Sequence, residues 1–221
     1  QNRIMKAKRS LGQNFFANRN LAEQISNIVL ENNPDLIVEI GPGTGSFTKY
    51  LSEGKDLLLI EKDDILSENL RSKFPKKTVL NIDFLDWGME ELIPYSNEKI
   101  IFFGSLPYNV SKPIIRKIIR SDYFNSFAYF IIQKEVAEKY IAKAPDSNIL
   151  SLETEIFATS KKLFDISRES FRPKPNVTSS FISFSAKNSS FDYDIRDFES
   201  FLQTIFRHPR KTVKNNLGRM H

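Results

Sequence analysis

The chain has 221 residues, of which 40% are hydrophobic, and this length allows one substantial core with a small appendage but not two full domains. Cysteine is absent, and the only two histidines are His208 and His221, so disulfides, thiolate metal sites and a Ser-His-Asp triad in the main domain are excluded. No apolar run approaches the roughly 20 residues of a membrane span, and no apolar segment follows the basic start as in a secretory signal. A cytoplasmic protein is expected.

The net charge of +5 is unevenly distributed along the chain. Residues 1–10 and 207–221 together carry nine Lys and Arg and no Asp or Glu, which leaves residues 11–206 with a net charge of −4. Such basic ends are candidates for contact with a polyanion, although solvated, frayed termini would have the same composition.

Strand-like and helix-like segments alternate through the first two thirds of the chain. Buried strands are expected at residues 35–40, 56–61, 78–83, 98–104 and 127–133. Helices are expected at residues 46–54, 64–74, 112–121 and 134–144. This alternation predicts an α/β fold with a doubly wound, mostly parallel sheet that helices cover on both faces.

The pattern changes after Pro145. A helix is expected at 151–159, followed by alternating strands at 161–167 and 177–185 that would form an antiparallel pair on the edge of the sheet. Residues 195–206 place apolar side chains on one helical stripe, and a second short helix is expected at 210–220. We therefore divide the chain into a main domain, 1–190, and the start of a small helical domain, 191–221.

The stretch VEIGPGTGSF (38–47) places Gly41, Gly43 and Gly45 directly after a strand. Glycines here allow a sharp turn and let a ligand lie against the backbone. The dinucleotide fingerprint has a final glycine where this chain has Ser46, and Glu39 before the turn is a poor neighbour for a pyrophosphate. Glu39 would suit a sulfonium and an amino-acid ammonium instead.

Three acidic residues, Glu39, Glu61 and Asp83, end successive expected strands. Glu61 lies twenty residues after Gly41, where a carboxylate can accept hydrogen bonds from both hydroxyls of a ribose. Asp83 could accept a hydrogen bond from an adenine amino group, although by itself it would more often be a turn residue or a helix cap. Together, at one edge of a doubly wound sheet, the three predict a site for an adenosine-type ligand.

The stretch SLPYN follows the fourth expected strand and lies beside these acids. Pro107 stiffens the loop, Tyr108 offers a face on which a base can stack, and the Ser105 hydroxyl can bond an amine. Methylation of an aromatic amine requires this combination, because acceptors that hold the two N–H bonds localise the lone pair of the nitrogen. In-line placement against a methyl sulfonium then contributes most of the remaining effect.

Four stretches, in this order, resemble the ribosomal RNA adenine dimethyltransferases: GQNFFANRNLAEQI (12–25), VEIGPGTGSFTKYL (38–51), LPYNVSKPII (106–115) and FRPKPNVTSSFI (171–182). These are S-adenosylmethionine-dependent enzymes that convert adenine to dimethyladenine. The resemblance covers nearly the whole chain and implies the seven-stranded, Rossmann-like sheet of a class I methyltransferase. It also implies a monomer that acts without a metal, with the rRNA of the small ribosomal subunit, in a pre-30S particle, as its partner.

The resemblance implies that Gln13 and Asn14 help to close over S-adenosylmethionine, that Gly41 cradles it, and that Glu61 and Asp83 bind its ribose and its adenine. The full set of expected cofactor-binding residues is Gln13, Asn14, Phe15, Glu39, Gly41, Gly43, Glu61, Lys62, Asp83, Phe84 and Ser105.

The resemblance also implies that Tyr108 and Phe171 sandwich a flipped target base, while Ser105 and the carbonyl of Leu106 hold its amino group. The expected catalytic residues are Ser105, Leu106, Pro107, Tyr108 and Phe171. The expected RNA-binding residues are Arg9, Arg207, Arg210, Lys211 and Lys214.

Two branches of the family compete for this chain. The motifs GQNF and LPYN resemble those of the housekeeping branch, which modifies two adjacent adenines near the 3′ end of the small-subunit (16S) rRNA. The antibiotic-resistance branch acts on large-subunit (23S) rRNA and more often carries isoleucine at position 106 and a different residue at position 12.

Three features depart from the family pattern. Ser105 stands where the family has asparagine, although serine is found at the equivalent place in methyltransferases that act on the cytosine amine. The stretch APDSNILSLET (144–154) is shorter than usual, and residues 207–221 resemble only the start of the C-terminal domain, which we expect to be incomplete. Two alternatives therefore stay open: a cofactor-binding ribosome-assembly factor whose catalysis Ser105 impairs, and, less favoured, a DNA adenine methyltransferase.

Overall fold

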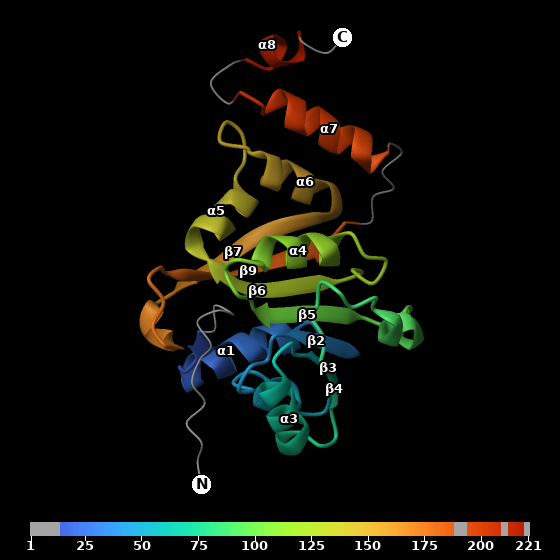
Figure 1. The fold of residues 1–221 in the computed structure, drawn as a ribbon, viewed down its shortest axis with the longest axis vertical. Coiled ribbons are helices and arrows are strands. Elements are labelled where there is room, and N and C mark those ends of the chain that lie inside the picture. The colour runs from blue at the N-terminus through green and yellow to red at the C-terminus, as the bar shows by residue number, and fades with distance from the viewer. Residues whose placement is uncertain (1–13, 188–193, 209–211, 219–221) are drawn as a thin grey trace.

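The computed structural model describes residues 14–187, 194–208 and 212–218. A seven-stranded sheet in the order β4-β3-β2-β5-β6-β9-β7 forms its centre (Figure 1). Its strands are β2 (Leu36–Ile40), β3 (Asp56–Ile60), β4 (Thr78–Leu80), β5 (Ile100–Ser105), β6 (Phe127–Gln133), β7 (Ala158–Ile166) and β9 (Ser179–Ala186). The neighbours from β4 to β6 are parallel, whereas β9 is antiparallel to both β6 and β7. The sequence-based predictions of a mostly parallel sheet and of its closing antiparallel pair are confirmed.

Side chains along the strands alternate between two core layers. Leu36, Val38 and Ile40 of β2 pack in one layer, which also contains residues of α4 (Ser111–Ile119) and α5 (Lys134–Ile141). Ile37 packs in the other layer, with residues of α1 (Arg19–Leu30), α2 (Thr48–Leu51) and α3 (Asp64–Lys73). Helices thus cover both faces, which is why the central strands are buried and apolar almost throughout.

Local capping fixes where several helices begin. Asn18 accepts a hydrogen bond from the Leu21 N–H at the start of α1, and Asp63 accepts from the Ile65 and Leu66 N–H groups at the start of α3. At α6 (Ile149–Phe157), Asn148 and Ser151 cap each other reciprocally. Such caps satisfy backbone donors that have no partner inside the helix.

Some elements differ from the sequence-based prediction. β4 ends at Leu80 rather than residue 83, because residues 83–87 form a turn, and α1 was not among the expected helices. Two short strands, β1 (Phe15–Phe16) and β8 (Phe171–Arg172), pair with each other although they are far apart in sequence. Short 3₁₀ helices also occur at η2 (Glu90–Tyr95) and η3 (Arg168–Ser170).

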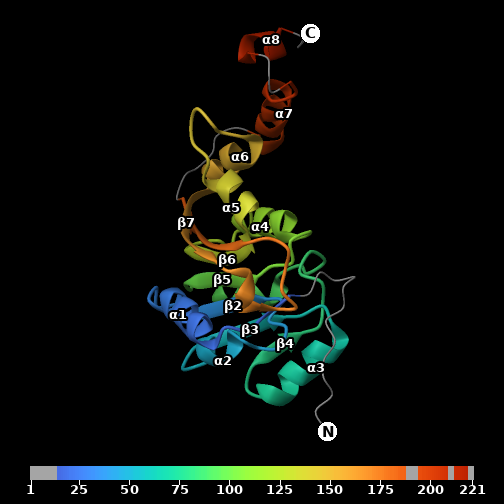
Figure 2. The same cartoon turned by 90° about the vertical axis from the view of Figure 1, so that its left-hand side faces the viewer.

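The helices α7 (Ile195–Ile205) and α8 (Val213–Leu217) lie beyond α6 at one end of the molecule, away from the centre of the sheet (Figure 2). Glu199 of α7 forms ion pairs with Arg116 of α4 and with Arg120, the residue after α4. The Asn216 amide donates to the Ile205 carbonyl oxygen at 2.8 Å. The two helices expected near the C-terminus are therefore present, while a domain boundary at residue 190 stays a prediction.

In the described parts of the chain, every helix is too short or too polar to cross a bilayer. Among the same residues, the acidic and histidine side chains form no group of three that could hold a metal ion.

Candidate active site

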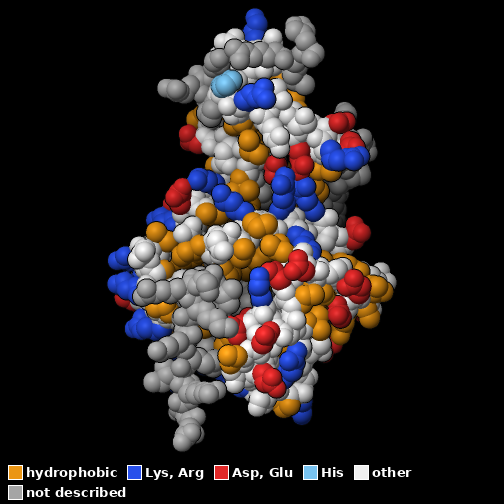
Figure 3. All heavy atoms as spheres, in the orientation of Figure 1, with side chains coloured by type: hydrophobic (Ala, Val, Ile, Leu, Met, Phe, Trp, Pro, Cys, Tyr) orange, Lys and Arg blue, Asp and Glu red, His pale blue; other side chains and the backbone are white. Residues whose placement is uncertain are grey.

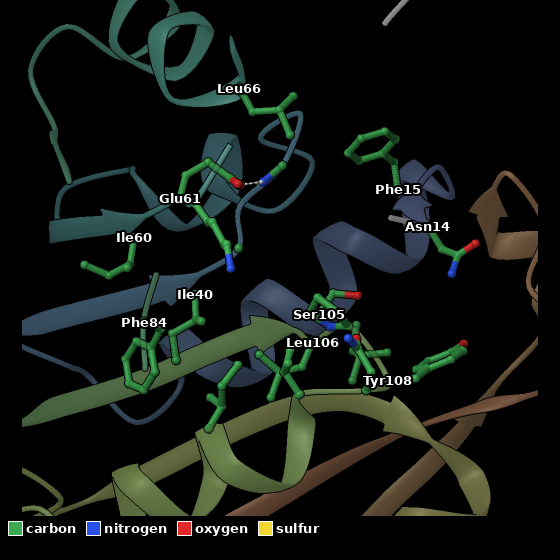
Figure 4. Close-up of a pocket in the computed structure, with 18 of the residues that line it drawn as sticks. Asn14, Phe15, Ile40, Ile60, Glu61, Leu66, Phe84, Ser105, Leu106 and Tyr108 are labelled. Atoms are coloured by element: carbon green, nitrogen blue, oxygen red, sulfur yellow. Dashed lines mark hydrogen bonds between the residues drawn. The ribbon is translucent and has the colours of Figure 1, made fainter. Parts of the chain in front are cut away.

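A cavity of about 280 Å³ lies at the carboxyl edge of the parallel strands, where β2, β3 and β5 end (Figure 4). Glu61 and Phe84 lie toward one end of it, and Ser105 and Tyr108 lie toward the other (Figure 4). Of the predicted site residues, those that line it are Asn14, Phe15, Gly41, Gly43, Glu61, Lys62, Asp83, Phe84, Ser105, Leu106, Pro107, Tyr108 and Phe171. The structure therefore brings the expected cofactor side and the expected acceptor side into one cavity.

The glycine-rich turn forms one wall of the cavity. Gly41 and Gly43 have φ angles of +63° and +58°, which side chains with a Cβ rarely adopt. A Cβ at Gly43 would lie 3.1 Å from Cδ1 of Phe15, whereas the space beside Gly41 is open. The turn thus presents bare backbone to the cavity, as a ligand that packs against it requires.

Glu61 directly follows β3 and is held by the backbone on both sides. Its Oε2 accepts from the Gly43 N–H at 3.0 Å, and its Oε1 accepts from the Asp63 N–H at 2.9 Å. Only 6% of the residue is exposed, and burial raises its pKa against the opposing effect of these hydrogen bonds. Each carboxylate oxygen can accept further hydrogen bonds, so Glu61 is oriented and still able to bind hydroxyls.

Asp83 and Lys62 form an ion pair at the rim of the cavity, with 2.6 Å between Nζ and Oδ2. Asp83 Oδ1 accepts from the Leu85 N–H at 3.0 Å. Partial burial acts to raise the pKa of Asp83, but the Lys62 hydrogen bond, the Leu85 N–H and nearby positive charge outweigh it, so the pKa is lowered. Asp83 is therefore an ionised acceptor beside the ring of Phe84, which also lines the cavity.

Among the predicted site residues that the structure describes, Glu39 is the one that lies elsewhere than predicted. It does not line the cavity, is 1% exposed, and accepts a hydrogen bond from Thr48 Oγ1 at 2.8 Å. The cause is strand alternation: Glu39 shares a face of β2 with Ile37, which packs toward α1 and α2, whereas Ile40 faces the cavity. Burial raises the pKa of Glu39 to about 8, against the effect of the Thr48 hydroxyl. The structure thus gives direct cofactor contact by Glu39 no support.

Ser105 ends β5 and begins the acceptor side of the cavity. Gly104 before it is required by packing, because a Cβ there would lie 2.7 Å from the Ile40 carbonyl oxygen of the adjacent strand. The Leu106 N–H donates to the Ile131 carbonyl oxygen at 3.0 Å, which anchors the peptide after Ser105. Within the described residues, the Ser105 hydroxyl has no hydrogen-bond partner, so it is available to a ligand.

The aromatic residues of the acceptor side are fixed by neighbours. The hydroxyl groups of Tyr108 and Ser179 are 2.9 Å apart and hydrogen bonded. Phe171 is 2% exposed and meets the ring of Phe16 edge-on, with 5.1 Å between centroids. Because Phe16 and Phe171 also face each other in the β1–β8 pair, the N-terminal segment is tied to the residue expected to contact the target base.

Sequence reasoning missed several lining residues. They are Ile40, Ile60, Leu66, Ile82, Asn109, Val110, Ile114, Ile131 and Ser179. Ile40 ends one expected strand and Ile60 precedes Glu61 at the end of another, so both could have been found from strand ends that were expected at the site. Ser179 had no such signal, since it is one of two adjacent serines at the start of β9, a strand expected only to close the sheet.

The expected RNA-binding residues fall partly outside the described residues. Arg207 follows α7 and Lys214 lies in α8, and both are exposed. Arg9, Arg210 and Lys211 lie outside the described residues, as does the expected cofactor residue Gln13. Figure 3 shows Lys and Arg side chains mixed with Asp and Glu over the body of the molecule, as the charge distribution along the chain predicted.

Solved structures share this fold. The 23S rRNA methyltransferase ErmE aligns with a TM-score of 0.77 at 23% identity, covering 94% of this chain and 85% of that one. A dimethyladenosine transferase from Plasmodium falciparum aligns with a TM-score of 0.81 at 24% identity, covering 93% of this chain and 75% of that one.

Sequence comparison is more specific. The chain is 38% identical over 219 residues to "Ribosomal RNA small subunit methyltransferase A" of Mycoplasma mobile, covering 97% of this chain and 84% of that protein. It is also 38% identical over 217 residues to the protein of that name from Malacoplasma penetrans, covering 96% of this chain and 78% of that protein. A family model described as "Ribosomal RNA adenine dimethylase" matches residues 4–221. The chain therefore belongs to the ribosomal RNA adenine dimethylase family.

Proposed function

We propose that this protein transfers methyl groups from S-adenosylmethionine to the N6 amino groups of two adjacent adenines near the 3′ end of small-subunit rRNA. The observation that carries the proposal is the single cavity in which Glu61 and Asp83 lie on one side and Ser105, Leu106 and Tyr108 on the other. The relatives at 38% identity carry small-subunit names, which favours this rRNA over the large-subunit alternative.

The residues on the cofactor side fit S-adenosylmethionine. The open backbone at Gly41 gives room for the ligand, and the carboxylate of Glu61 is fixed by the Gly43 N–H with acceptor capacity left for ribose hydroxyls. Asp83 is held ionised by Lys62 and can accept from the adenine amino group. When bound, S-adenosylmethionine supplies an activated methyl group on a sulfonium.

The acceptor side holds and orients the amine. Tyr108 offers its ring for stacking, and its hydroxyl bond to Ser179 restricts the ring orientation. The Ser105 hydroxyl and the Leu106 carbonyl are the acceptors for the two amino N–H bonds. Acceptors placed this way localise the nitrogen lone pair, and alignment with the methyl group supplies the larger part of the rate enhancement. A general base is not needed, because the methylated ammonium is acidic enough to lose its proton to water.

The protein is proposed to act as a monomer in the cytoplasm, on a small-subunit particle during ribosome biogenesis. Particles that lack the modification, naked small-subunit rRNA, large-subunit particles and duplex DNA should be supplied separately with methyl-labelled S-adenosylmethionine. Label should enter the small-subunit particle. Preferential labelling of large-subunit RNA or of DNA would instead support the corresponding alternative.

A second candidate function follows from Ser105. Its side chain lacks the amide carbonyl that the family asparagine would place in the cavity, so a ribosome-assembly factor that binds cofactor and RNA but turns over slowly is the main competitor. Tight binding of the particle with no labelling, followed by labelling in the Ser105→Asn variant, would favour that function.

A further inference from the structure

Lys117 of α4 directs its ammonium group at three backbone carbonyls of one turn. Its Nζ donates to the Phe84 oxygen at 3.0 Å, to the Leu85 oxygen at 2.8 Å and to the Trp87 oxygen. An ammonium has three N–H donors, so this side chain is fully used by the turn. Its Nζ also lies 5.5 Å from the centroid of the Phe84 ring.

The turn, residues 83–87, carries two residues of the cavity, Asp83 and Phe84. The Asp83 carbonyl oxygen accepts from the N–H groups of Asp86 and Trp87 at 3.0 and 3.1 Å, which closes the turn from inside. The carbonyls of Phe84, Leu85 and Trp87 point outward from it to Lys117. These hydrogen bonds are partly buried, and carbonyls shielded from water need partners, so the ammonium supplies what a regular strand or helix would supply elsewhere.

The helix that carries Lys117 also borders the acceptor side. Val110 and Ile114 line the cavity, and the hydroxyl of Ser111, the first residue of α4, donates to the Tyr108 carbonyl oxygen at 3.3 Å. One rigid helix thus contacts the acceptor loop at its start and the 83–87 turn less than two helical turns later.

We propose that Lys117 is a positioning residue for the cofactor: it fixes the 83–87 turn so that Asp83 and Phe84 meet the adenine of S-adenosylmethionine. This proposal rests on the proposed function, since it assigns that turn to the adenine. The positive charge of Lys117 also acts on Asp83, whose pKa it helps to lower. Loss of the ammonium therefore loosens the turn and weakens the cofactor site without touching the acceptor groups.

The test uses Lys117→Met, which keeps the aliphatic stem and removes the donors, and Lys117→Arg, which keeps charge and donors. Lys112→Met removes the same charge from an exposed position of the same helix and is the matched control. Trp87 is the only tryptophan of the chain and is 2% exposed, so its fluorescence reports on the turn directly. Lys117→Gln replaces Lys117→Met in all measurements if the methionine variant does not fold.

In Lys117→Met we expect the Trp87 emission to shift to the red and the Kd of S-adenosylhomocysteine to rise about ten-fold, as loss of a charge-assisted contact predicts. At saturating cofactor, kcat and the KM for the particle should stay within about three-fold, and Lys117→Arg should restore most of the affinity. Lys112→Met should change neither the emission nor the Kd.

An unchanged Kd in Lys117→Met would overturn the proposal, whether or not the emission shifts. A Kd that rises equally in Lys112→Met would also overturn it, because charge alone would then explain the effect. Failure of the proposed function has a different signature: the unaltered protein would bind S-adenosylhomocysteine, and Lys117→Met would raise that Kd, but the small-subunit particle would not be methylated. A protein that does not bind S-adenosylhomocysteine at all would overturn both proposals.

Discussion

Tyr108 and Ser179 are joined by a 2.9 Å hydrogen bond between their hydroxyl groups, although they lie 71 residues apart in the chain. The bond links the loop after β5 to the first residue of β9 and holds the Tyr108 ring at the edge of the cavity. Burial raises the pKa of Tyr108 against the effect of this bond, so its hydroxyl stays protonated near neutral pH. Tyr108 is therefore a neutral, oriented stacking surface.

Two substitutions of Tyr108 distinguish the contribution of its ring to activity from the contribution of its hydroxyl. Tyr108→Ala removes a stacking contact worth roughly 1–3 kcal/mol, so kcat/KM for the particle should fall by about ten- to a hundred-fold. Tyr108→Phe keeps the ring and loses only the bond to Ser179, so it should cost less than about ten-fold. Steady-state methyl transfer measures both, and Ser179→Ala should match Tyr108→Phe. Equal losses in Tyr108→Ala and Tyr108→Phe would contradict the stacking role.

Ser105 decides between the two candidate functions. If its hydroxyl grips the target amine, Ser105→Ala should lower kcat by about a hundred-fold, the typical effect of removing one transition-state hydrogen bond. Ser105→Asn should also lower kcat, because the longer side chain occupies the space that serine leaves. Single-turnover methyl transfer with saturating cofactor is the measurement. A marked increase in Ser105→Asn would show that serine impairs catalysis and would favour the assembly-factor alternative.

Glu61 should control cofactor affinity. In Glu61→Gln an NH₂ group replaces one carboxylate oxygen. The variant therefore loses one of the two oxygens that accept hydrogen bonds from the Gly43 and Asp63 N–H groups. We expect the Kd of S-adenosylhomocysteine, measured by calorimetry, to rise by at least about ten-fold. Glu68→Gln on the exposed side of α3 is the control and should bind normally. Unchanged affinity in Glu61→Gln would remove Glu61 from the cofactor site.

Glu39 should make stability depend on pH. Its pKa is raised to about 8 in the folded protein from an ordinary value of 4.5, so between these values the folded state binds more protons than the unfolded state. The contribution of Glu39 to the free energy of unfolding is therefore complete below about pH 4.5 and is lost progressively as the pH rises toward 8.

Glu39→Gln removes this titration while keeping an acceptor for the Thr48 hydroxyl. Urea unfolding at about pH 5 and about pH 8 should show a smaller loss of stability in the variant than in the unaltered protein. Because Glu39 does not line the cavity, the Kd of Glu39→Gln for the cofactor should stay within about three-fold of the value for the unaltered protein. Parallel pH dependence in both proteins would contradict the buried, protonated state of Glu39.

The exposed cations near the C-terminus should bind RNA. The double substitution Arg207→Glu and Lys214→Glu should weaken binding of the particle. It should also make the negative slope of log K against log salt shallower by about two, while the Kd for the cofactor is unchanged. The control reverses Lys55 and Lys76, which precede β3 and β4 at the opposite edge of the sheet from the cavity. An equal loss in the control would mean that net charge, and not this surface, governs binding. Charge reversal at Arg210 and Lys211, outside the described residues, is expected to act in the same way.

Much of the fold could be predicted because strands of a doubly wound sheet are continuous apolar runs. Runs such as 56–61 and 127–133 leave little choice of structure, and the observed strands β3 and β6 match them within a residue. The β1–β8 pair could not be found this way, since two-residue strands have no periodicity and depend on tertiary contacts such as Phe16 with Phe171.

The site was predictable where it depends on strand ends and turns, as for Gly43 and Glu61. It was not predictable where side-chain direction matters. Glu39 lies just before the turn that contains Gly41. The two-residue period of β2 nevertheless directs its carboxylate toward the face that α1 and α2 cover. Lys117 gave no signal either, because its role depends on the folded path of the 83–87 turn.

The most direct test of the central claim is to incubate the unaltered protein with S-adenosylmethionine and small-subunit particles that lack the modification. The 3′ fragment of the rRNA is then isolated and its nucleosides are measured by mass spectrometry, with reverse-transcription stops to locate them. We predict N6,N6-dimethyladenine at two adjacent positions. Unmodified adenines, on particles that a known enzyme of this family does methylate, would contradict the account.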